Sequence, residues 1–355
     1  MYDTIVIGAG QAGLSTGYYL KQTKQSFILL DKCSEIGESW KERYDSLVLF
    51  TPRIYSSLPG MVLEGEEQGF PTKDEIASYL KKYVNIFKIP VQFNTEVVSV
   101  TKANDYFSIE TNNKEYYTKN IVVATGTFQI PSIPSFSRGL SGDIIQLHSS
   151  QYKNPDQLID GNVLVIGGGN SGAQIAVELS KDRETYLACS GKPIYLPLSV
   201  GGKSVFWWFD KFGILKANDK SILGRLLQQR GDPIFGYDLK TAIHNNKVII
   251  KDRVTGAKEI QIIFEDTSTL EVSNVIWATG FKTEFPWLKI DGLLNKEGKI
   301  VHERGVSNIQ GLSFVGLPWQ YRRGSALLQG VGYDAEYIVR QIVSNNLAST
   351  IGLKR

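Results

Sequence analysis

The feature that most constrains the fold is a strand-like run at residues 3–7, apolar from Ile5 to Ile7, that leads directly into closely spaced glycines. The run predicts a short buried strand, and Gly8, Gly10 and Gly13 follow it in the spacing Gly-x-Gly-x-x-Gly before a helical pattern. In such a turn the first glycine allows the tight bend, the second a close approach to the backbone, and the third packing of the helix on the strand. A unit of this kind is typical of an α/β fold with a parallel sheet.

The same turn has the chemistry of a dinucleotide-binding site. The helix that follows presents free N–H groups, including those of Gln11 and Ala12, and the positive end of its dipole to a diphosphate. A second apolar run at residues 27–30 ends in Asp31, which is placed to accept hydrogen bonds from ribose hydroxyls, with Lys32 beside it. The segment is therefore predicted to form a dinucleotide cradle.

A second copy of this stretch occupies residues 162–173. It predicts a second cradle, formed by Gly167, Gly169, Asn170, Ser171 and Gly172. Each copy is followed much later by a β-branched run and an Ala-Thr-Gly tripeptide, at Ala124, Thr125 and Gly126 and again at Ala278, Thr279 and Gly280. The chain is therefore predicted to be an α/β protein with two Rossmann-like dinucleotide-binding domains.

The remaining elements predict that the first domain is discontinuous. A capping box at residues 72–75 opens an amphipathic helix. Strands are expected near 91–100, 105–111 and 114–118, connectors between the domains at 127–134 and 281–286, and a final helix at 334–343. The C-terminal piece cannot form a domain alone, so we expect the first domain to comprise residues 1–155 and 282–355 and the second residues 156–281.

Composition excludes several functions. The chain has 39 Lys and Arg against 36 Asp and Glu, a net charge of +3, so no bulk charge draws it to nucleic acid or a membrane. Cys33 and Cys189 form no C-x-x-C dithiol, and three histidines without metal-ligand spacing predict no metal site. No apolar run is long enough for a membrane span, and the first strand begins at once, so a cytoplasmic protein is expected.

These motifs, together with Gly37-x-x-Trp40 and the segments 311–316 and 330–335, resemble the flavin-containing monooxygenases and, more closely, their compact bacterial relatives. The resemblance covers nearly the whole chain. It implies FAD in the first domain, NADPH or NADH in the second, and O2 as the oxidant. It also implies that a flavin hydroperoxide forms and oxygenates a small soft nucleophile, such as a sulfide or an amine, or a ketone.

The resemblance also assigns residues. FAD is expected to contact the first cradle and its Ala-Thr-Gly turn together with Trp40, Val97 and Gly330, the last through N–H groups just before the final helix. The chemistry needs no catalytic triad, and we assign no catalytic residue; it needs a dry pocket. The residues expected at the flavin face or in the pocket wall are Phe50, Trp207 and Trp319, although packing or a subunit contact is the alternative for Trp207.

The chain departs from the family pattern in two places. The family motif between the domains is Phe-x-Gly-x-x-x-His-x-x-x-(Phe or Tyr); His148 and Tyr152 fit its second half, but Gly142 lies too far before His148. Many members also carry an Asn that one residue separates from the Pro corresponding to Pro52, and this chain has Phe50 at that position. A phenyl ring donates no hydrogen bond, so the contact that the Asn makes to the flavin's oxygen adduct must come from elsewhere, such as NADP+ itself.

Nucleotide choice follows from the repeat. The position in the second cradle that corresponds to Asp31 is Ser190, which does not repel a 2′-phosphate, and nearby Lys192 would attract one. The Arg that grips this phosphate in relatives is missing. We therefore expect both NADPH and NADH to be accepted.

Two other functions stay open at this point. One is an NAD(P)H-dependent flavin reductase of the pyridine-nucleotide disulfide reductase superfamily without oxygenation, and the other is a flavin-binding regulatory protein without turnover. The expected partners are a small-molecule substrate and O2, without nucleic acid or membrane. Exposed tryptophans would also favour a homodimer.

Overall fold

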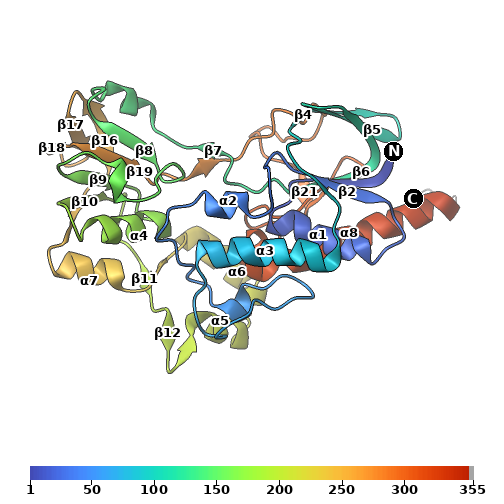
Figure 1. The fold of residues 1–355 in the computed structure, drawn as a ribbon, viewed down its shortest axis with the longest axis horizontal. Coiled ribbons are helices and arrows are strands. Elements are labelled where there is room, and N and C mark those ends of the chain that lie inside the picture. The colour runs from blue at the N-terminus through green and yellow to red at the C-terminus, as the bar shows by residue number, and fades with distance from the viewer. Residues whose placement is uncertain (352–355) are drawn as a thin grey trace.

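The parallel strands of the chain form two separate sheets that a short antiparallel ribbon connects (Figure 1). The computed structural model describes residues 1–351. Each sheet contains the strand that leads into one of the two Gly-x-Gly-x-x-Gly turns, so the sequence repeat is also a structural repeat. The predicted α/β class with two Rossmann-like units is confirmed.

The first sheet has nine strands, with β1 between β2 and β6. These three strands are parallel, and Ile5 of β1 pairs with Ile28 and Ile121. The chain returns from the second unit to add β23 in parallel beside β6, so the first unit is discontinuous, as predicted. The strands are β1 Tyr2–Ile7, β2 Phe27–Leu30, β3 Val91–Gln92, β4 Val97–Ala103, β5 Tyr106–Thr111, β6 Glu115–Val123, β21 His302–Glu303, β22 Val306–Ser307 and β23 Leu312–Phe314.

Three long helices pack together below this sheet in Figure 1, with α1 in contact with both α3 and α8. The predicted capping box of α3 is present, because the Thr72 hydroxyl accepts from the Glu75 N–H at 3.3 Å and the Glu75 carboxylate accepts from the Thr72 N–H at 2.8 Å. Among the described residues no helix is long and apolar enough to cross a membrane. The helices of this unit are α1 Gln11–Lys21, α2 Glu38–Lys41, η1 Arg53–Tyr55, α3 Lys73–Phe87, η5 Arg323–Ala326 and α8 Leu328–Ile351.

Two elements of the first unit differ from the predicted bounds. The strand expected at 91–100 is divided into β3 and β4, and Asn94 between them has a left-handed backbone with φ 51°. The final helix begins at Leu328, so Gly330 lies inside α8 and not before it. A Cβ on Gly330 would lie 2.4 Å from the carbonyl oxygen of Gly324. Close backbone packing therefore accounts for this glycine.

The second sheet has five parallel strands in the order β15-β10-β9-β19-β8. Side chains of β9 alternate between two cores: Val163 and Val165 pack with α4 and α7, and Leu164 and Ile166 pack with the antiparallel sheet β16–β18. The elements are β8 Ile145–His148, β9 Val163–Ile166, α4 Asn170–Leu179, β10 Thr185–Ala188, α7 Asp238–His244, β15 Val248–Lys251, β16 Val254–Lys258, β17 Gln261–Phe264, β18 Thr269–Glu271 and β19 Asn274–Trp277.

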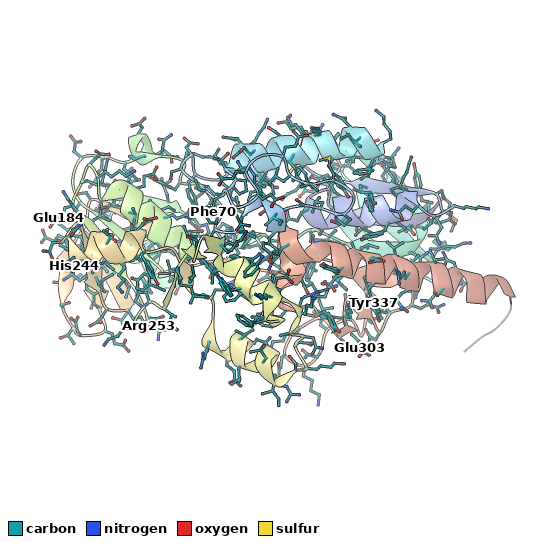
Figure 2. All side chains as sticks on the ribbon, turned by 90° about the horizontal axis from the view of Figure 1, so that it is seen from below. Phe70, Glu184, His244, Arg253, Glu303 and Tyr337 are labelled. Carbon is teal, nitrogen blue, oxygen red and sulfur yellow. The ribbon has the colours of Figure 1, made fainter. Side chains whose placement is uncertain are left out.

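An insertion between β10 and α7 reaches from the second unit to the first. Figure 2, which views the molecule from below, shows its yellow helices between the second unit and α8. The Asp219 N–H donates to the Tyr321 carbonyl at 2.9 Å, and Lys220 forms a 2.7 Å ion pair with Glu303. The insertion comprises β11 Tyr195–Leu196, β12 Ser199–Val200, β13 Lys203–Ser204, α5 Val205–Lys211, η4 Ile214–Lys216, α6 Ile222–Arg230 and β14 Ile234–Phe235.

The predicted connectors lie side by side. β7 (Ile130–Pro131) on the outward path pairs antiparallel with β20 (Phe281–Lys282) on the return path. The segment after β7 contains η2 (Ser135–Gly139), β8 and η3 (Pro155–Gln157), and β8 already belongs to the second sheet. We therefore propose that the second domain begins directly after β7, earlier than the residue 156 expected from sequence.

Both Ala-Thr-Gly strands carry an asparagine in the same place. Asn120 of β6 donates to the Asp3 carbonyl at 2.9 Å, and Asn274 of β19 donates to the carbonyls of Ile159 and Asn162 at 3.0 Å each. The Asn274 amide oxygen also accepts from the Ile159 N–H at 3.0 Å, and Asn274 is fully buried. Asn120 thus ties β1 itself, and Asn274 the loop before β9, to the Ala-Thr-Gly strand of its unit.

Replacing Asn274 by the isosteric leucine should destabilise the protein by about 3 kcal/mol, because this fully buried side chain loses three hydrogen bonds to backbone groups. Urea unfolding measures the change. Asn113→Leu in the exposed β5–β6 turn is the control and should change the free energy of unfolding by no more than about 0.5 kcal/mol. Equal effects of the two substitutions would contradict this assignment.

Candidate functional site

The first cradle is formed where β1 ends. Gly8 has φ +103°, and its N–H donates to the Leu30 carbonyl at 2.7 Å. A Cβ on Gly8 would lie 2.6 Å from the Ala124 carbonyl oxygen, and one on Gly13 would lie 1.9 Å from the Gly8 carbonyl oxygen. By contrast, a Cβ on Gly10 would have nothing within 4 Å. The turn is therefore closed toward the protein and open in front of Gly10.

The second cradle repeats this geometry. Gly167 has φ +122°, and its Cβ would lie 2.2 Å from the Ala278 carbonyl oxygen. A Cβ on Gly172 would lie 2.0 Å from the Gly167 carbonyl oxygen, and a Cβ on Gly169 would again have nothing within 4 Å. In both units the first-turn N–H groups of the helix have no intrahelical partner and are available to an anion.

Asp31, the predicted ribose-binding acid, also holds the first turn. One carboxylate oxygen accepts from the Ala9 N–H and the other from the Cys33 N–H at 2.8 Å. A carboxylate oxygen has a further lone pair, so Asp31 retains acceptor capacity for a ribose. Lys32 next to it is exposed, and Val97 is half-buried at the start of β4.

Side chains anchor both Ala-Thr-Gly turns. The Gln129 amide donates to the Thr125 hydroxyl at 3.1 Å and to the Gly126 carbonyl at 2.8 Å. In the second unit the Thr279 hydroxyl donates to the Ser132 carbonyl at 2.5 Å. The Gly280 carbonyl accepts from the Ser132 N–H at 2.9 Å. Residues of the outward connector thus fix both turns.

His148 has a structural position. Its Nδ1 accepts from the Ser150 N–H at 3.2 Å, and its Nε2 lies 2.9 Å from the Gly280 carbonyl oxygen. This network assigns the neutral tautomer with the proton on Nε2, which donates to the carbonyl. Burial lowers the pKa of His148, in agreement with a neutral ring. Both ring nitrogens are engaged within the protein, so His148 is not placed as a general base.

The side chain of Asn170 forms its hydrogen bonds within the protein. Its amide donates to the Pro233 carbonyl at 2.9 Å and accepts from the Phe235 N–H at 2.9 Å, which fixes β14. Its backbone N–H in the first turn of α4 remains available. Ser171, beside it, interacts with the Tyr44 hydroxyl. Sequence spacing alone could not show that β14 would use this amide.

Ser190 and Lys192 follow β10, and both are exposed. They lie beyond the strand that neighbours β9, which is the position from which an adenosine ribose is recognised in Rossmann units. Neither side chain forms a hydrogen bond or ion pair with the described part of the chain.

A C-terminal segment lines the first cradle. Gly316 has φ +91°, and a Cβ there would lie 3.0 Å from the Ala12 Cβ. The Gln11 amide donates to the Ala326 carbonyl at 3.4 Å, just before the first turn of α8. Trp319 between these contacts is half-buried and has φ +52°, a strained value for a bulky residue. Trp40, on α2, is half-buried against the core of the first unit.

The structure brings Phe50 together with aromatic residues of the insertion. The Phe50 ring stacks on Phe235 at 4.5 Å and on Phe206 at 6.2 Å between centroids. The Arg323 guanidinium lies 5.4 Å from the Phe235 centroid. Phe235 and Arg323 were missed by the sequence analysis because neither lies in a recognisable motif.

Trp207 does not join this aromatic cluster. Its ring meets Trp208 edge-on at 4.8 Å and lies 4.8 Å from Lys211 Nζ. Phe206 and Trp207 are successive residues of α5 and therefore point about 100° apart around the helix. The expectation that Trp207 lines a pocket with Phe50 is not supported, and the alternative of a packing or surface role fits better.

Two family models and a close relative match this chain. Residues 5–194 match the family model described as pyridine nucleotide-disulphide oxidoreductase, and residues 213–306 match the model described as flavin-binding monooxygenase-like. The chain is 65% identical over 342 residues to the Bacillus subtilis protein named uncharacterized oxidoreductase CzcO, covering 96% of this chain and 99% of the relative. The chain belongs to the flavin-containing monooxygenase-like flavoproteins.

More distant relatives agree with this family. A probable indole-3-pyruvate monooxygenase of Arabidopsis thaliana is 27% identical, with 96% of this chain and 90% of the relative covered. The solved flavin-containing monooxygenase of Stenotrophomonas maltophilia superposes with a TM-score of 0.82 at 27% identity, covering 97% and 98% of the two chains. The protein is thus a flavin-dependent oxidoreductase.

The cradles fit the cofactors that this family uses. A flavin-containing monooxygenase-like protein uses a flavin and a nicotinamide dinucleotide. Gly10 and Gly169 leave room for a diphosphate at each helix N-terminus, and no acidic side chain occupies the first turn of α1 or α4. Among the described residues, no group of three or more His, Cys, Asp or Glu side chains is placed to hold a metal ion.

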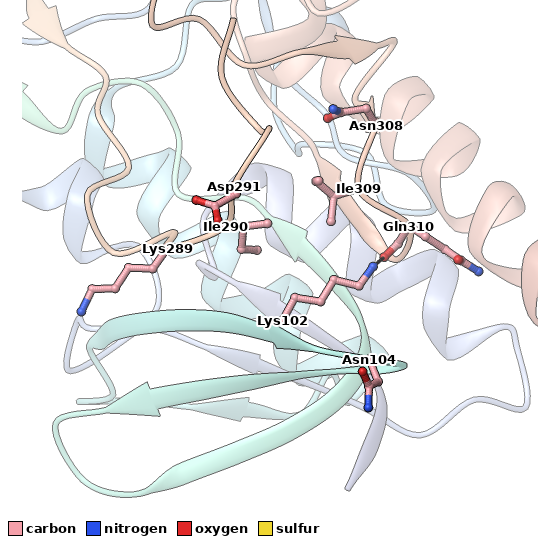
Figure 3. A pocket seen from close by; sticks show the side chains of 8 residues that line it. All are labelled: Lys102, Asn104, Lys289, Ile290, Asp291, Asn308, Ile309 and Gln310. Atoms are coloured by element: carbon pink, nitrogen blue, oxygen red, sulfur yellow. Dashed lines mark hydrogen bonds between the residues drawn. The ribbon is translucent and has the colours of Figure 1, made fainter.

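A hollow elsewhere on the surface contains none of these residues. Figure 3 shows it beside the β4–β5 hairpin, with Lys102 donating to the Gln310 carbonyl at 2.6 Å. Its lining is polar and open, and it contains neither a glycine turn nor an aromatic wall. It is therefore not assigned to the cofactors.

The two open glycines provide a matched pair of tests. Gly10→Val should preserve the fold, because its φ of −74° suits valine and its Cβ meets nothing, but should reduce bound FAD to less than about a tenth per chain. Gly169→Val should keep FAD and raise the Kd for NADP+ by about tenfold or more. Flavin absorbance and calorimetric titration measure the two effects.

Gly142→Val is the control, because its Cβ also has nothing within 4 Å but the residue lies outside both cradles. It should bind both nucleotides normally. Retention of both nucleotides by all three variants would contradict the assignment of the cradles.

Proposed function

We propose that this protein uses NADPH or NADH to reduce bound FAD and then uses O2 to oxygenate a small soft nucleophile, such as a sulfide or an amine, or a ketone. The first cradle would hold FAD and the second the nicotinamide dinucleotide. The observation that carries the proposal is the duplicated open cradle in a chain of the monooxygenase-like family. The relatives named as monooxygenases support the oxygenation step.

The chain's own residues would bind and position the cofactors and exclude water from the reacting atoms. When bound, the flavin supplies the acceptance of hydride and the activation of O2. The turn of Gly8, Gly10 and Gly13 would place the free N–H groups at the start of α1 at its diphosphate, and Asp31 would offer a carboxylate to its ribose. The stacked rings of Phe50, Phe206 and Phe235 form an apolar wall that would keep water from the reacting atoms.

Phe50 leaves the protein without a side-chain hydrogen-bond donor at the position that Asn occupies in many relatives. Its ring has no hydrogen-bond donor, and one of its faces stacks on Phe235. We therefore propose that the hydrogen bond supplied by Asn in many relatives comes here from the bound nicotinamide dinucleotide. This agrees with a reaction in which the oxidised dinucleotide stays bound until oxygenation is complete.

A reductase without oxygenation is the second candidate, favoured by the family description of residues 5–194. A reductase that works through a dithiol needs a reactive thiolate, and this chain offers none. Burial raises the pKa of Cys33 to about 12 and that of Cys189 to about 11, so both thiols stay protonated at neutral pH. The candidate that remains is direct electron transfer from the reduced flavin.

Exposed apolar residues of the insertion support a homodimer. Phe212, Ile222 and Leu226 are 67%, 81% and 49% exposed on one protruding segment. Covering such a patch with a second copy would remove apolar surface from water. We therefore propose that the protein forms a homodimer. We also propose a cytoplasmic location, where both thiols stay reduced.

The direct test supplies NADPH and 18O2 with methyl phenyl sulfide, trimethylamine or cyclohexanone as the acceptor. We expect 18O in the product of at least one acceptor and hydrogen peroxide as a minor product. A Cys33→Ala/Cys189→Ala double variant should retain this activity. Oxidation of NADPH that yields only hydrogen peroxide with every acceptor would instead support the reductase candidate.

Nucleotide preference is a separate prediction. Ser190 and Lys192 are exposed, and neither repels a 2′-phosphate, so kcat/KM for NADPH and NADH should differ by about tenfold or less. Lys192→Ala should lower kcat/KM for NADPH by about threefold to tenfold without changing that for NADH. A wild-type preference of about a thousandfold, equivalent to about 4 kcal/mol, would contradict this part of the proposal.

A further inference from the structure

Arg43 lies at the junction of the two units. It follows α2 in the first unit, and its guanidinium carbon is 4.8 Å from the Phe128 centroid and 5.7 Å from the Phe281 centroid. Phe128 belongs to the outward connector and Phe281 to the return connector, and their ring centroids are 5.0 Å apart. Arg43 therefore contacts both crossings between the units.

The guanidinium of Arg43 has no polar partner. It makes no hydrogen bond or ion pair with any described residue, although it is largely buried. Burial lowers the pKa of Arg43, and the only group that raises it is the Tyr44 phenol. Contact with aromatic rings contributes about 0.5–2 kcal/mol. None of its three nitrogens is among the fully buried side-chain atoms without a partner in the described part of the chain, so the guanidinium reaches solvent and its donors are accessible to a ligand.

Three other partly buried arginines pair with carboxylates, whereas Arg322, like Arg43, lies over aromatic rings and forms no ion pair with a described residue. Arg304 pairs with the buried Asp334 at 3.1 Å, Arg323 with Asp232 at 2.8 Å, and Arg53 with Glu75. Arg43 retains all five N–H donors, and a guanidinium offers them in a planar fork that matches a carboxylate or phosphate.

The position of Arg43 is close to the second cradle. His148 meets the Phe281 ring edge-on at 4.8 Å and bonds the Gly280 carbonyl at the end of the second Ala-Thr-Gly turn. The next residue, Tyr44, donates to Gln174 of α4 at 2.8 Å. Arg43 therefore lies near the carboxyl ends of β8 and β19, the edge at which ligands bind in parallel α/β sheets.

We propose that Arg43 is an anion-binding residue that the first unit contributes to the ligand held between the units. Its partner is an oxyanion, either a phosphate of the nicotinamide dinucleotide or the carboxylate of an acidic substrate. The inference rests on the proposed function, because it assumes that the second cradle binds a dinucleotide. Such a contact makes ligand binding depend on both units being docked together.

The test compares FAD-loaded wild type with Arg43→Gln and Arg43→Lys by calorimetric titration of NADP+, NAD+ and phenylpyruvate. A charge-assisted hydrogen bond predicts that Arg43→Gln weakens binding of the anion about 10-fold to 100-fold. The affinity of Arg43→Lys should lie between those of wild type and Arg43→Gln, because lysine keeps the positive charge but loses the planar fork of donors. Arg138→Gln, on the exposed surface of η2, is the control and should bind as wild type.

The three ligands identify the anion. Equal weakening of NADP+ and NAD+ binding assigns the diphosphate, weakening of NADP+ alone the 2′-phosphate, and weakening of phenylpyruvate alone a substrate carboxylate. Each of these results supports the proposal. Affinities of Arg43→Gln within about twofold of wild type for all three ligands, with a lowered Tm, would overturn it and leave Arg43 a structural contact. Failure of wild type to bind FAD or NADP+ would refute the proposed function instead.

Discussion

The structure depends on a contact between backbones that only glycine permits. Gly8 lies against the carbonyl of Ala124, and Gly167 lies against that of Ala278, so close that a Cβ would overlap either oxygen. The contact brings together the carboxyl ends of two adjacent parallel strands in each unit. With these ends closed, the N-terminus of the following helix faces open space at Gly10 or Gly169, where its N–H groups can meet a diphosphate.

The second constraint is that the ligand of one cradle must reach the ligand of the other, so the two units must be held together. Several segments join the units: the paired connectors, the insertion that reaches Tyr321, and the loop after α2 whose Tyr44 is buried in the core of the second unit. Phe50 of that same loop stacks on Phe235 of the insertion. The apolar wall is therefore made by both units, and it exists only when they are docked.

The cradles could be predicted from sequence because each is a local strand, turn and helix, and because the chain contains the pattern twice. The discontinuous first unit followed from the order of motifs. The side-chain partners could not be predicted, since they depend on segments far apart in the chain. Asn170 is used by β14, Trp207 points away from Phe50 around α5, and Gly330 is required by the Gly324 backbone. Local patterns contain no information on these contacts.

We propose that the two cradles bind two different dinucleotides at the same time. Titration of NADP+ into FAD-loaded protein, with the flavin followed by its absorbance and the binding by calorimetry, distinguishes this from a single shared site. We expect one FAD and one NADP+ per chain, with no flavin released. Release of FAD as NADP+ binds, with a single nucleotide per chain, would rule out two separate sites.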